Sequence, residues 1–243
     1  MKNRDSAFFR LITTPVHTKG DELLIKISEL NQGRKTDDVF LSDPNYFSAL
    51  PGSPFAYWVN NQIIGLFSKL PSLQKAGYSI QIGASSHSDF RFLRLTWEIP
   101  RFYKITSGKW INFAKGGEYS PYYYDIHLCI NWNNKAQEIK EFISKQYPYL
   151  NGETDWLLHP ESSYFRPGLT WPRRTNRFSV RCLPSNCIFA DKGPAAFCQN
   201  DNPDDLLALL AVMNSSSFHN LVRILVAGTE LAQSFEVGLI QQI

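Results

Sequence analysis

Three segments of the chain carry apolar residues at helical spacing, namely 52–71, 133–148 and 200–217. In the first, Ser53 is the expected N-cap and Pro54 the first helical residue, and the pattern stops before a further proline. The second is amphipathic, which predicts a surface helix. In the third, Asn202 and Pro203 precede an acidic first turn and a run that is apolar on nearly every side. This pattern predicts a buried helix.

Short runs rich in aromatic and β-branched residues predict strands, and they lie at 78–83, 91–99, 126–132, 177–183 and 187–191. Turn signals at 114–118 and 183–186 favour hairpins over regular βαβ units. Nearer the N-terminus, 8–12 resembles a strand and 21–30 a short helix. We therefore predict an α+β fold, in which a mixed, mostly antiparallel β core from about 78 to 192 is flanked by helices.

Composition and charge change this picture by concentrating positive charge in the predicted β core. The 243 residues include 43% hydrophobic and 19% charged residues, which is typical of a globular chain, and the formal net charge is only +3. However, 91–115 and 162–192 each contain six lysines or arginines and one acidic residue. These two basic segments are therefore +5 each and the remainder is −7, as expected for contact with a polyanion.

Three further features of the sequence bear on the cellular compartment in which the protein is expected. The first 15 residues contain only a short apolar run broken by Arg10, so a cleaved signal peptide is not expected. No apolar run approaches the ~20 residues needed to cross a bilayer. Four clustered cysteines are too few to stabilise a chain of this length by disulfides. We expect a cytoplasmic protein without a membrane partner.

Motifs of common enzymes are missing from the sequence. It contains no Gly-rich nucleotide loop after a strand, no HExxH and no GxSxG. "SDPNYF" at 42–47 lacks the paired prolines of the Asn-Pro-Pro-Tyr-type motif that amino-methylating DNA methyltransferases use. Cys182, Cys187 and Cys198 lack the usual short zinc spacing, and buried thiols packed in the core are favoured over a metal site. We predict no catalytic and no metal-binding residues.

The most informative stretch is "FRPGLTWPRRTNRFSVR", 165–181, with five arginines and no acid. A guanidinium binds a phosphate or a guanine edge with two parallel hydrogen bonds, which lysine cannot do as well. The alternative is a loop whose arginines pair with the protein's own carboxylates. If the stretch is extended, Trp171, Arg173 and Arg177 share one face and Arg174 points the other way. We choose the first face for DNA, with the indole stacked on a guanidinium.

A second candidate is "FAKGGEYSPYYY", 113–124. Gly116 and Gly117 permit a tight turn that would let backbone N–H groups and Lys115 approach a phosphate. They would equally serve to close a hairpin, and the residues alone do not decide between the two.

Six motifs in one order resemble a known family: "LPGSPFAYWV", "FAKGGEYSPYY", "FRPGLTWPRRT", "CIFADKGPAAF", "LLALLAVMNS" and "SFEVGLIQ". They are similar to the region downstream of the catalytic domain in large adenine-specific DNA methyltransferases of BREX-type phage defence, which resemble combined restriction and modification enzymes. The resemblance runs from about Phe8 to the last residue. One departure is "IGASSHSDFRF", which stands where such enzymes often have a "TGDN"-like run.

The resemblance implies a division of the chain and a function. Residues 1–77 would be the tail of the catalytic-domain-like region and a helical connector, 78–192 the β-rich target-recognition region, and 193–243 a helical C-terminal segment. The resemblance implies a truncated or split member that recognises double-stranded DNA, and it leaves open whether a separate catalytic chain supplies the missing part. S-adenosylmethionine is the cofactor of the full-length family, but because the motifs for it are missing we expect none to bind this chain. The expected DNA-binding residues are Arg91, Arg94, Lys115, Gly116, Gly117, Arg166, Trp171, Arg173, Arg174 and Arg177.

Two alternatives remain. A carbohydrate- or protein-binding module would explain the density of aromatic residues, which are Trp97, Trp110, Tyr119, Tyr122, Tyr123 and Tyr124. Sugar sites, however, rarely need two segments of charge +5. The other alternative is an inert remnant of a split gene.

Overall fold

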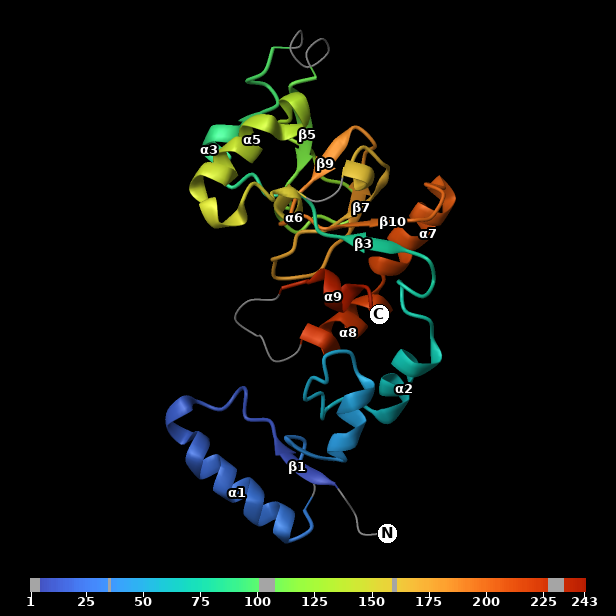
Figure 1. Cartoon of the computed structure of the whole chain (residues 1–243). Coiled ribbons are helices and arrows are strands. Elements are labelled where there is room, and N and C mark those ends of the chain that lie inside the picture. Colours follow the sequence, from blue (N-terminus) through green and yellow to red (C-terminus); the bar gives the residue numbers. More distant parts are fainter. Residues whose placement is uncertain (1–4, 35, 101–107, 159–160, 227–233) are drawn as a thin grey trace. The chain divides into compact units, whose positions relative to one another are not determined.

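The structure is a computed structural model that describes residues 5–34, 36–100, 108–158, 161–226 and 234–243. It divides into two compact units, Met1–Pro71 and Ser72–Ile243 (Figure 1). Each unit is described by itself below. The threefold division by role, at 77 and 192, stays a prediction.

The first unit consists of a two-stranded antiparallel sheet and two helices. Its elements are β1 (Ser6–Phe9), α1 (Lys19–Asn31), β2 (Val39–Ser42) and α2 (Asn61–Lys69). Phe8 of β1 stacks on Tyr57 with ring centroids 4.8 Å apart. The helix expected at 21–30 is confirmed, whereas the strand expected at 8–12 begins earlier, at Ser6, and ends at Phe9.

The helix expected to begin at Pro54 begins seven residues later, at Asn61. Ser53 has a positive φ of 48°, which a helical N-cap does not have. Instead the side chain of Asn60 accepts a hydrogen bond from the backbone N–H of Ile63 at 2.9 Å, and α2 starts at the next residue. Asn60, which the sequence analysis did not identify as a cap, satisfies a free N–H group of the helix in place of Ser53.

The second unit contains two four-stranded sheets. The first has the order β3 (Ser79–Gln81), β10 (Ala195–Phe197), β7 (Gly168–Thr170) and β8 (Arg181–Leu183), and all its pairs are antiparallel. The second has the order β4 (Leu93–Leu95), β6 (Leu128–Asn131), β5 (Trp110–Ala114) and β9 (Cys187–Phe189). Only β5 and β9 run parallel. This is the predicted α+β fold with a mixed, mostly antiparallel core. Each of the five predicted runs contains one of these strands.

The two sheets are joined where β3 leads toward β9. The backbone N–H of Ala84 donates to the carbonyl of Phe189 at 3.0 Å. A Cβ on Gly83 would lie 2.0 Å from that carbonyl oxygen, so only glycine permits the approach. The predicted hairpin at 183–186 is wrong, because this turn carries the chain from β8 in one sheet to β9 in the other. The segment 115–127, between β5 and β6, is likewise too long for a tight hairpin.

Helices cover the sheets in two separate cores. The helix α5 (Asn133–Gln146) lies beside β5 of the second sheet (Figure 1). Its Ile139 and Ile143 belong to the same buried core as Phe113 and Ile130 of that sheet. The first sheet packs against α7 (Pro203–Met213), α8 (Ser216–Val226) and α9 (Val237–Ile240). The remaining short helices are α3 (Asp89–Phe92), α6 (Asp155–Leu158) and the 3₁₀ turns Val16–Thr18, Pro44–Ala49, Pro148–Leu150 and Glu161–Ser163.

The helices predicted at 133–148 and 200–217 are both present, as α5 and α7. The expectation that the second is buried on nearly every side is wrong, because Leu207 and Val212 of α7 are 58% and 53% exposed. The Asn202 side chain accepts a hydrogen bond from the backbone N–H of Asp204 at 2.8 Å, and Pro203 is the first residue of α7. The start of α5 departs from regular helix, because 134–136 all have positive φ. In the described part of the chain no helix is by itself long and apolar enough for a membrane span, and only α7 and α8 together, bent by 63°, reach such a length and composition.

Candidate DNA-binding surface

The two basic segments meet at the turn formed by Gly116 and Gly117. Gly116 has a φ of 94°, and a Cβ on it would lie 2.4 Å from the carbonyl oxygen of Lys192. Gly117 has a φ of 111°, and its Cβ would lie 3.1 Å from the ring of Tyr124. The first basic segment therefore lies directly against the end of the second, and the contact depends on the two glycines.

Arg181 holds this turn from inside the protein. Its side chain is buried, donates to the carbonyl of Gly116, and donates to the carbonyl of Glu118 at 3.1 Å. The guanidinium lies 4.3 Å from the ring centroid of Tyr124. Burial lowers the pKa of Arg181 against the opposing influence of Tyr124. The sequence does contain a signal for this role, because strand alternation puts Arg181 on the same face as the core residue Leu183.

The motif containing Trp171 packs against the motif "SFEVG" near the C-terminus. The indole is fully buried and its Nε1–H donates to the carbonyl of Phe235 at 3.0 Å. The backbone N–H of Phe235 in turn donates to the carbonyl of Arg173 at 2.8 Å, and Arg174 forms a β-bridge with Ser234. The expected exposed position of Trp171 on a DNA face is therefore wrong, since the indole supports the loop from the core.

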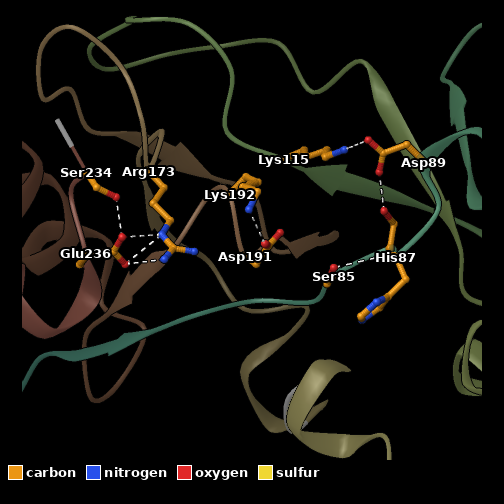
Figure 2. Close-up of polar contacts among 10 residues, drawn as sticks. Ser85, His87, Asp89, Lys115, Arg173, Asp191, Lys192, Ser234 and Glu236 are labelled. Atoms are coloured by element: carbon orange, nitrogen blue, oxygen red, sulfur yellow. Dashed lines mark hydrogen bonds and ion pairs between the residues drawn. The ribbon is translucent and has the colours of Figure 1, made fainter. Parts of the chain in front are cut away.

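Two of the expected arginines have carboxylate partners within the protein. Arg173 donates from Nε to both oxygens of Glu236 at 2.9 Å, and its Nη2 lies 2.8 Å from Oε2 (Figure 2). Arg166 pairs with Asp201, with 2.7 Å between Nη2 and Oδ1, and this interaction raises the pKa of Arg166. The alternative prediction, in which the arginines pair with the protein's own carboxylates, is confirmed for Arg166 and Arg173.

The Glu236 carboxylate is also bonded by the hydroxyl of Ser234 at 2.5 Å. Burial alone would raise the pKa of Glu236. Hydrogen bonds from Arg173 and Ser234, together with the charges of Arg173 and Arg174, outweigh burial and lower this pKa. Glu236 therefore stays ionised at neutral pH and holds Arg173 in place.

Lys115 is held in a smaller network on the other side of Lys192. Its ammonium group binds Asp89, which also accepts a hydrogen bond from Ser86 (Figure 2). Burial opposes ionisation of Asp89, but the two hydrogen bonds and the charges of Lys115 and Lys192 lower its pKa. This network includes part of the segment "IGASSHSDFRF". It fixes the position of Lys115 and neutralises part of its charge.

Arg174 and Arg177 are exposed, and no ion pair involves either of them within the described residues. Arg177 lies over the ring of Tyr119, 5.2 Å from its centroid. The predicted alternation of faces is wrong because the stretch bends instead of extending. The hydroxyl of Thr175 bonds the carbonyl of Arg177 at 2.6 Å, and such local bonds compete with an extended backbone.

Arg91 and Arg94 belong to α3 and β4. Both are exposed, and both contact aromatic rings. Arg91 lies 5.1 Å from the ring centroid of Phe142, and Arg94 lies 5.7 Å from that of Trp110. Of the ten expected residues, Gly116 and Arg173 contact Lys192 directly, since the turn at Gly116 approaches the Lys192 carbonyl and the backbone N–H of Arg173 donates to it at 3.0 Å.

Beside the glycine turn lies a cavity of about 220 Å³. Its lining includes the apolar residues Phe113, Ile126 and Leu128, and the cations Lys115, Arg181 and Lys192. Cys182, expected in the core, is instead exposed and lines this cavity, whereas the other three cysteines are buried. Burial raises the pKa of the Cys187 thiol to about 12. Within the described residues no group of three or more potential ligands could hold a metal ion.

Comparison with known proteins supports the resemblance drawn from the motifs. The chain is 28% identical over 214 residues to the adenine-specific methyltransferase BrxX of Escherichia coli O9:H4 (strain HS), which covers 86% of this chain. It is 28% identical over 204 residues to the adenine-specific methyltransferase PglX of Lacticaseibacillus casei (strain Zhang), which covers 77% of this chain. The chain matches no protein-family model.

The matched region spans 16% of the length of each of these two relatives. Most of each relative therefore lies outside the region that resembles this chain. Over most of its own length, the chain is similar to one part of large adenine-specific methyltransferases.

Proposed function

We propose that this chain is the DNA-recognition portion of an S-adenosylmethionine-dependent, N6-adenine-specific DNA methyltransferase of BREX-type phage defence. The observation that supports this proposal most is the contact between the two basic segments at Gly116 and Lys192. It brings the ends of the two basic segments into contact, which supports the proposal because a polyanion binds best where cations share one surface. BrxX and PglX are adenine-specific methyltransferases, so the similarity to them supports DNA as the polyanion.

The structure suggests separate roles for the basic residues. Arg174 and Arg177 are exposed and without an ion pair among the described residues, so they are the proposed direct contacts. Lys115 and the glycine turn are proposed to contact the phosphate backbone. Arg166, Arg173 and the buried Trp171 would position these groups from within the protein. Arg91 and Arg94 are proposed as outer contacts.

Methyl transfer is proposed to occur outside this chain, in another part of a longer protein or in a separate catalytic chain. The sequence contains neither a Gly-rich cofactor loop nor an Asn-Pro-Pro-Tyr-type motif. We therefore expect the chain alone not to bind S-adenosylmethionine and not to methylate DNA. Calorimetric titration with the cofactor tests this, and saturable binding at micromolar concentration would contradict it.

A carbohydrate-binding function is the second candidate, because several aromatic side chains are exposed. Trp97 is 71% exposed, Tyr122 55% and Tyr123 68%. Aromatic faces of this kind stack on sugars as well as on bases. Tighter binding to an oligosaccharide than to duplex DNA would favour this candidate, and the absence of any ligand would favour an inert remnant.

The decisive experiment is duplex binding by the chain across a salt series. Affinity should fall linearly with salt on a double-logarithmic plot, with a slope of about −0.9 for each phosphate neutralised. The variants Arg174→Gln and Arg177→Gln should each reduce the magnitude of this slope by about one unit if each neutralises one phosphate. Lys145→Gln is the matched control, since Lys145 is an exposed cation on α5 and its removal changes net charge equally. A flat slope for the unmodified chain would refute the proposal.

A further inference from the structure

The short helix α3 buries one phenylalanine and exposes another. Phe92 is fully buried, and its ring packs edge-on against Phe142 of α5, with ring centroids 5.4 Å apart. This contact anchors α3 to the core of the second sheet. Phe90, two residues earlier, is 95% exposed, more than any other large apolar side chain in the described part of the chain. Because burial is what makes a phenylalanine stabilising, Phe90 adds little to the stability of its own unit.

The backbone at Phe90 is held on both sides. The Nη1 group of Arg94 donates to the carbonyl of Phe90 at 2.9 Å and to that of Leu93 at 2.6 Å. The preceding residue, Asp89, binds the ammonium group of Lys115 (Figure 2). Phe90 is therefore one residue away from the partner of a proposed phosphate contact. Since its backbone is already fixed, little conformational freedom would be lost when its side chain meets a partner.

Two exposed cations flank Phe90 in the chain. Arg91 follows it directly, and the bond from Arg94 to the Phe90 carbonyl brings a second guanidinium close. Aromatic rings orient both guanidinium groups. In the part of the chain that the structure describes, no ion pair involves either arginine. They differ in this from Lys115 and Lys192, each of which binds a carboxylate of the protein.

This combination of one apolar side chain and two unpaired cations matches duplex DNA. A single exposed apolar side chain is common on protein surfaces and by itself indicates no partner. Duplex DNA, however, carries its phosphates on the outside and its stacked bases within. Proteins that kink DNA insert an apolar wedge, often a phenylalanine, between two base pairs, and basic side chains bind the neighbouring phosphates.

We propose that Phe90 inserts between two stacked base pairs of the bound duplex and kinks it, with Arg91 and Arg94 on the phosphates at either side. The inference rests on the proposed function and deepens it, since it assigns how the bound DNA is deformed. Separating two stacked base pairs costs least at the flexible pyrimidine–purine steps, TA and CA/TG. The chain should therefore favour sites with such a step, at a position that no hydrogen bond reads.

Circularisation of DNA by a ligase measures bending wherever the chain binds. A duplex of about 150 base pairs, one persistence length, closes slowly unless a protein bends it. The unmodified chain at saturation should speed closure by about tenfold, and Phe90→Ala should leave it near the rate of free DNA. Phe90→Leu keeps an apolar wedge and should restore most of the increase. Phe55→Ala is the matched control, because Phe55 is 71% exposed and belongs to the other unit. Equal rates with the unmodified chain and Phe90→Ala would overturn the proposal.

Duplex titration across a salt series separates this inference from the proposed function. Phe90→Ala removes no charge, so its salt slope should equal that of the unmodified chain, whereas Arg91→Gln should reduce the slope by about one unit. Thermal melting checks that each variant is folded. If the unmodified chain binds duplex DNA but does not speed closure, the wedge proposal fails and the DNA-binding proposal stands. If duplex DNA does not bind at any salt concentration, the DNA-binding proposal fails and the wedge proposal fails with it.

An apolar contact with a second copy of the chain is the other use that an exposed phenylalanine could have. Sedimentation velocity over a range of protein concentrations tests this. Self-association that is lost in Phe90→Ala, together with equal closure rates for the two proteins, would assign Phe90 to that contact and overturn the wedge.

Discussion

At the scale of single residues, Gly116 shows how backbone geometry decides what the basic segments can do. Its positive φ and its approach to the Lys192 carbonyl are separate demands that only glycine meets together. The sequence indicated a turn here, because two adjacent glycines are a strong turn signal. It gave no information on the partner of the turn, since Lys192 is 76 residues away. The close approach of Gly116 to the Lys192 carbonyl depends on the folded positions of both segments.

This distinction leads to a prediction for Gly116→Ala with Gly77→Ala as its control. Gly77 has a nearly identical φ of 93° but nothing within 4 Å of an added Cβ. Gly77→Ala should therefore cost only the backbone strain, about 1 kcal/mol of unfolding free energy. Gly116→Ala should cost more, and it should weaken duplex binding because the turn must move away from Lys192. Urea unfolding and duplex titration measure both effects, and equal losses in the two variants would show that the close approach is unimportant.

At the scale of elements, the same arginine-rich stretch serves the fold and the proposed function in different residues. Arg173 and the buried Trp171 attach the loop to residues 234–236, whereas Arg174 and Arg177 face solvent. The sequence located this stretch, since five arginines without an acid are unusual. The sequence did not show which of these arginines are paired within the protein and which face solvent. Glu236 is 63 residues from Arg173, and strand alternation does not apply to a bent loop. The start of α7 was predictable from Asn202 and Pro203, whereas the start of α2 was not, because Asn60 caps this helix in place of the expected Ser53.

The pairing of Arg173 with Glu236 predicts how attachment of this loop depends on pH. The folded state lowers the pKa of Glu236, so the pair stabilises the protein above the ordinary pKa of glutamate. That stabilisation is lost as pH falls through the lowered value. Glu236→Gln should therefore reduce the free energy of unfolding by about 0.5–1 kcal/mol at neutral pH, a modest amount because the pair is partly exposed. The difference from the unmodified chain should vanish in acid.

Glu153→Gln is the control for this prediction, since Glu153 is exposed and makes the same change of charge. Urea unfolding at a series of pH values gives the free energies for all three proteins. A deficit in Glu236→Gln that is constant from neutral to acidic pH would mean that the ion pair is not its cause.

At the scale of the whole molecule, the proposed DNA-binding residues all belong to one compact unit. The chain divides at Pro71, and all ten expected contacts lie within Ser72–Ile243. Both extended hydrophobic cores also lie in this unit. The sequence predicted a mostly antiparallel β region with charge concentrated in it, because periodicity and local composition are local properties. The order of the strands could not be read in the same way, since it depends on pairings between residues far apart in the chain.

A fragment of residues 72–243 should therefore reproduce duplex binding by the full chain. We expect the same salt slope, because the phosphate contacts proposed here are all retained. Duplex titration of the two proteins across one salt series measures the slope, and circular dichroism with thermal melting checks that the fragment is folded. A fragment that folds but binds with a smaller slope would show that residues 1–71, which include Arg10, Lys19 and Arg34, supply phosphate contacts of their own. An unchanged slope together with loss of cooperative melting would instead mean that binding needs charge density and not this fold.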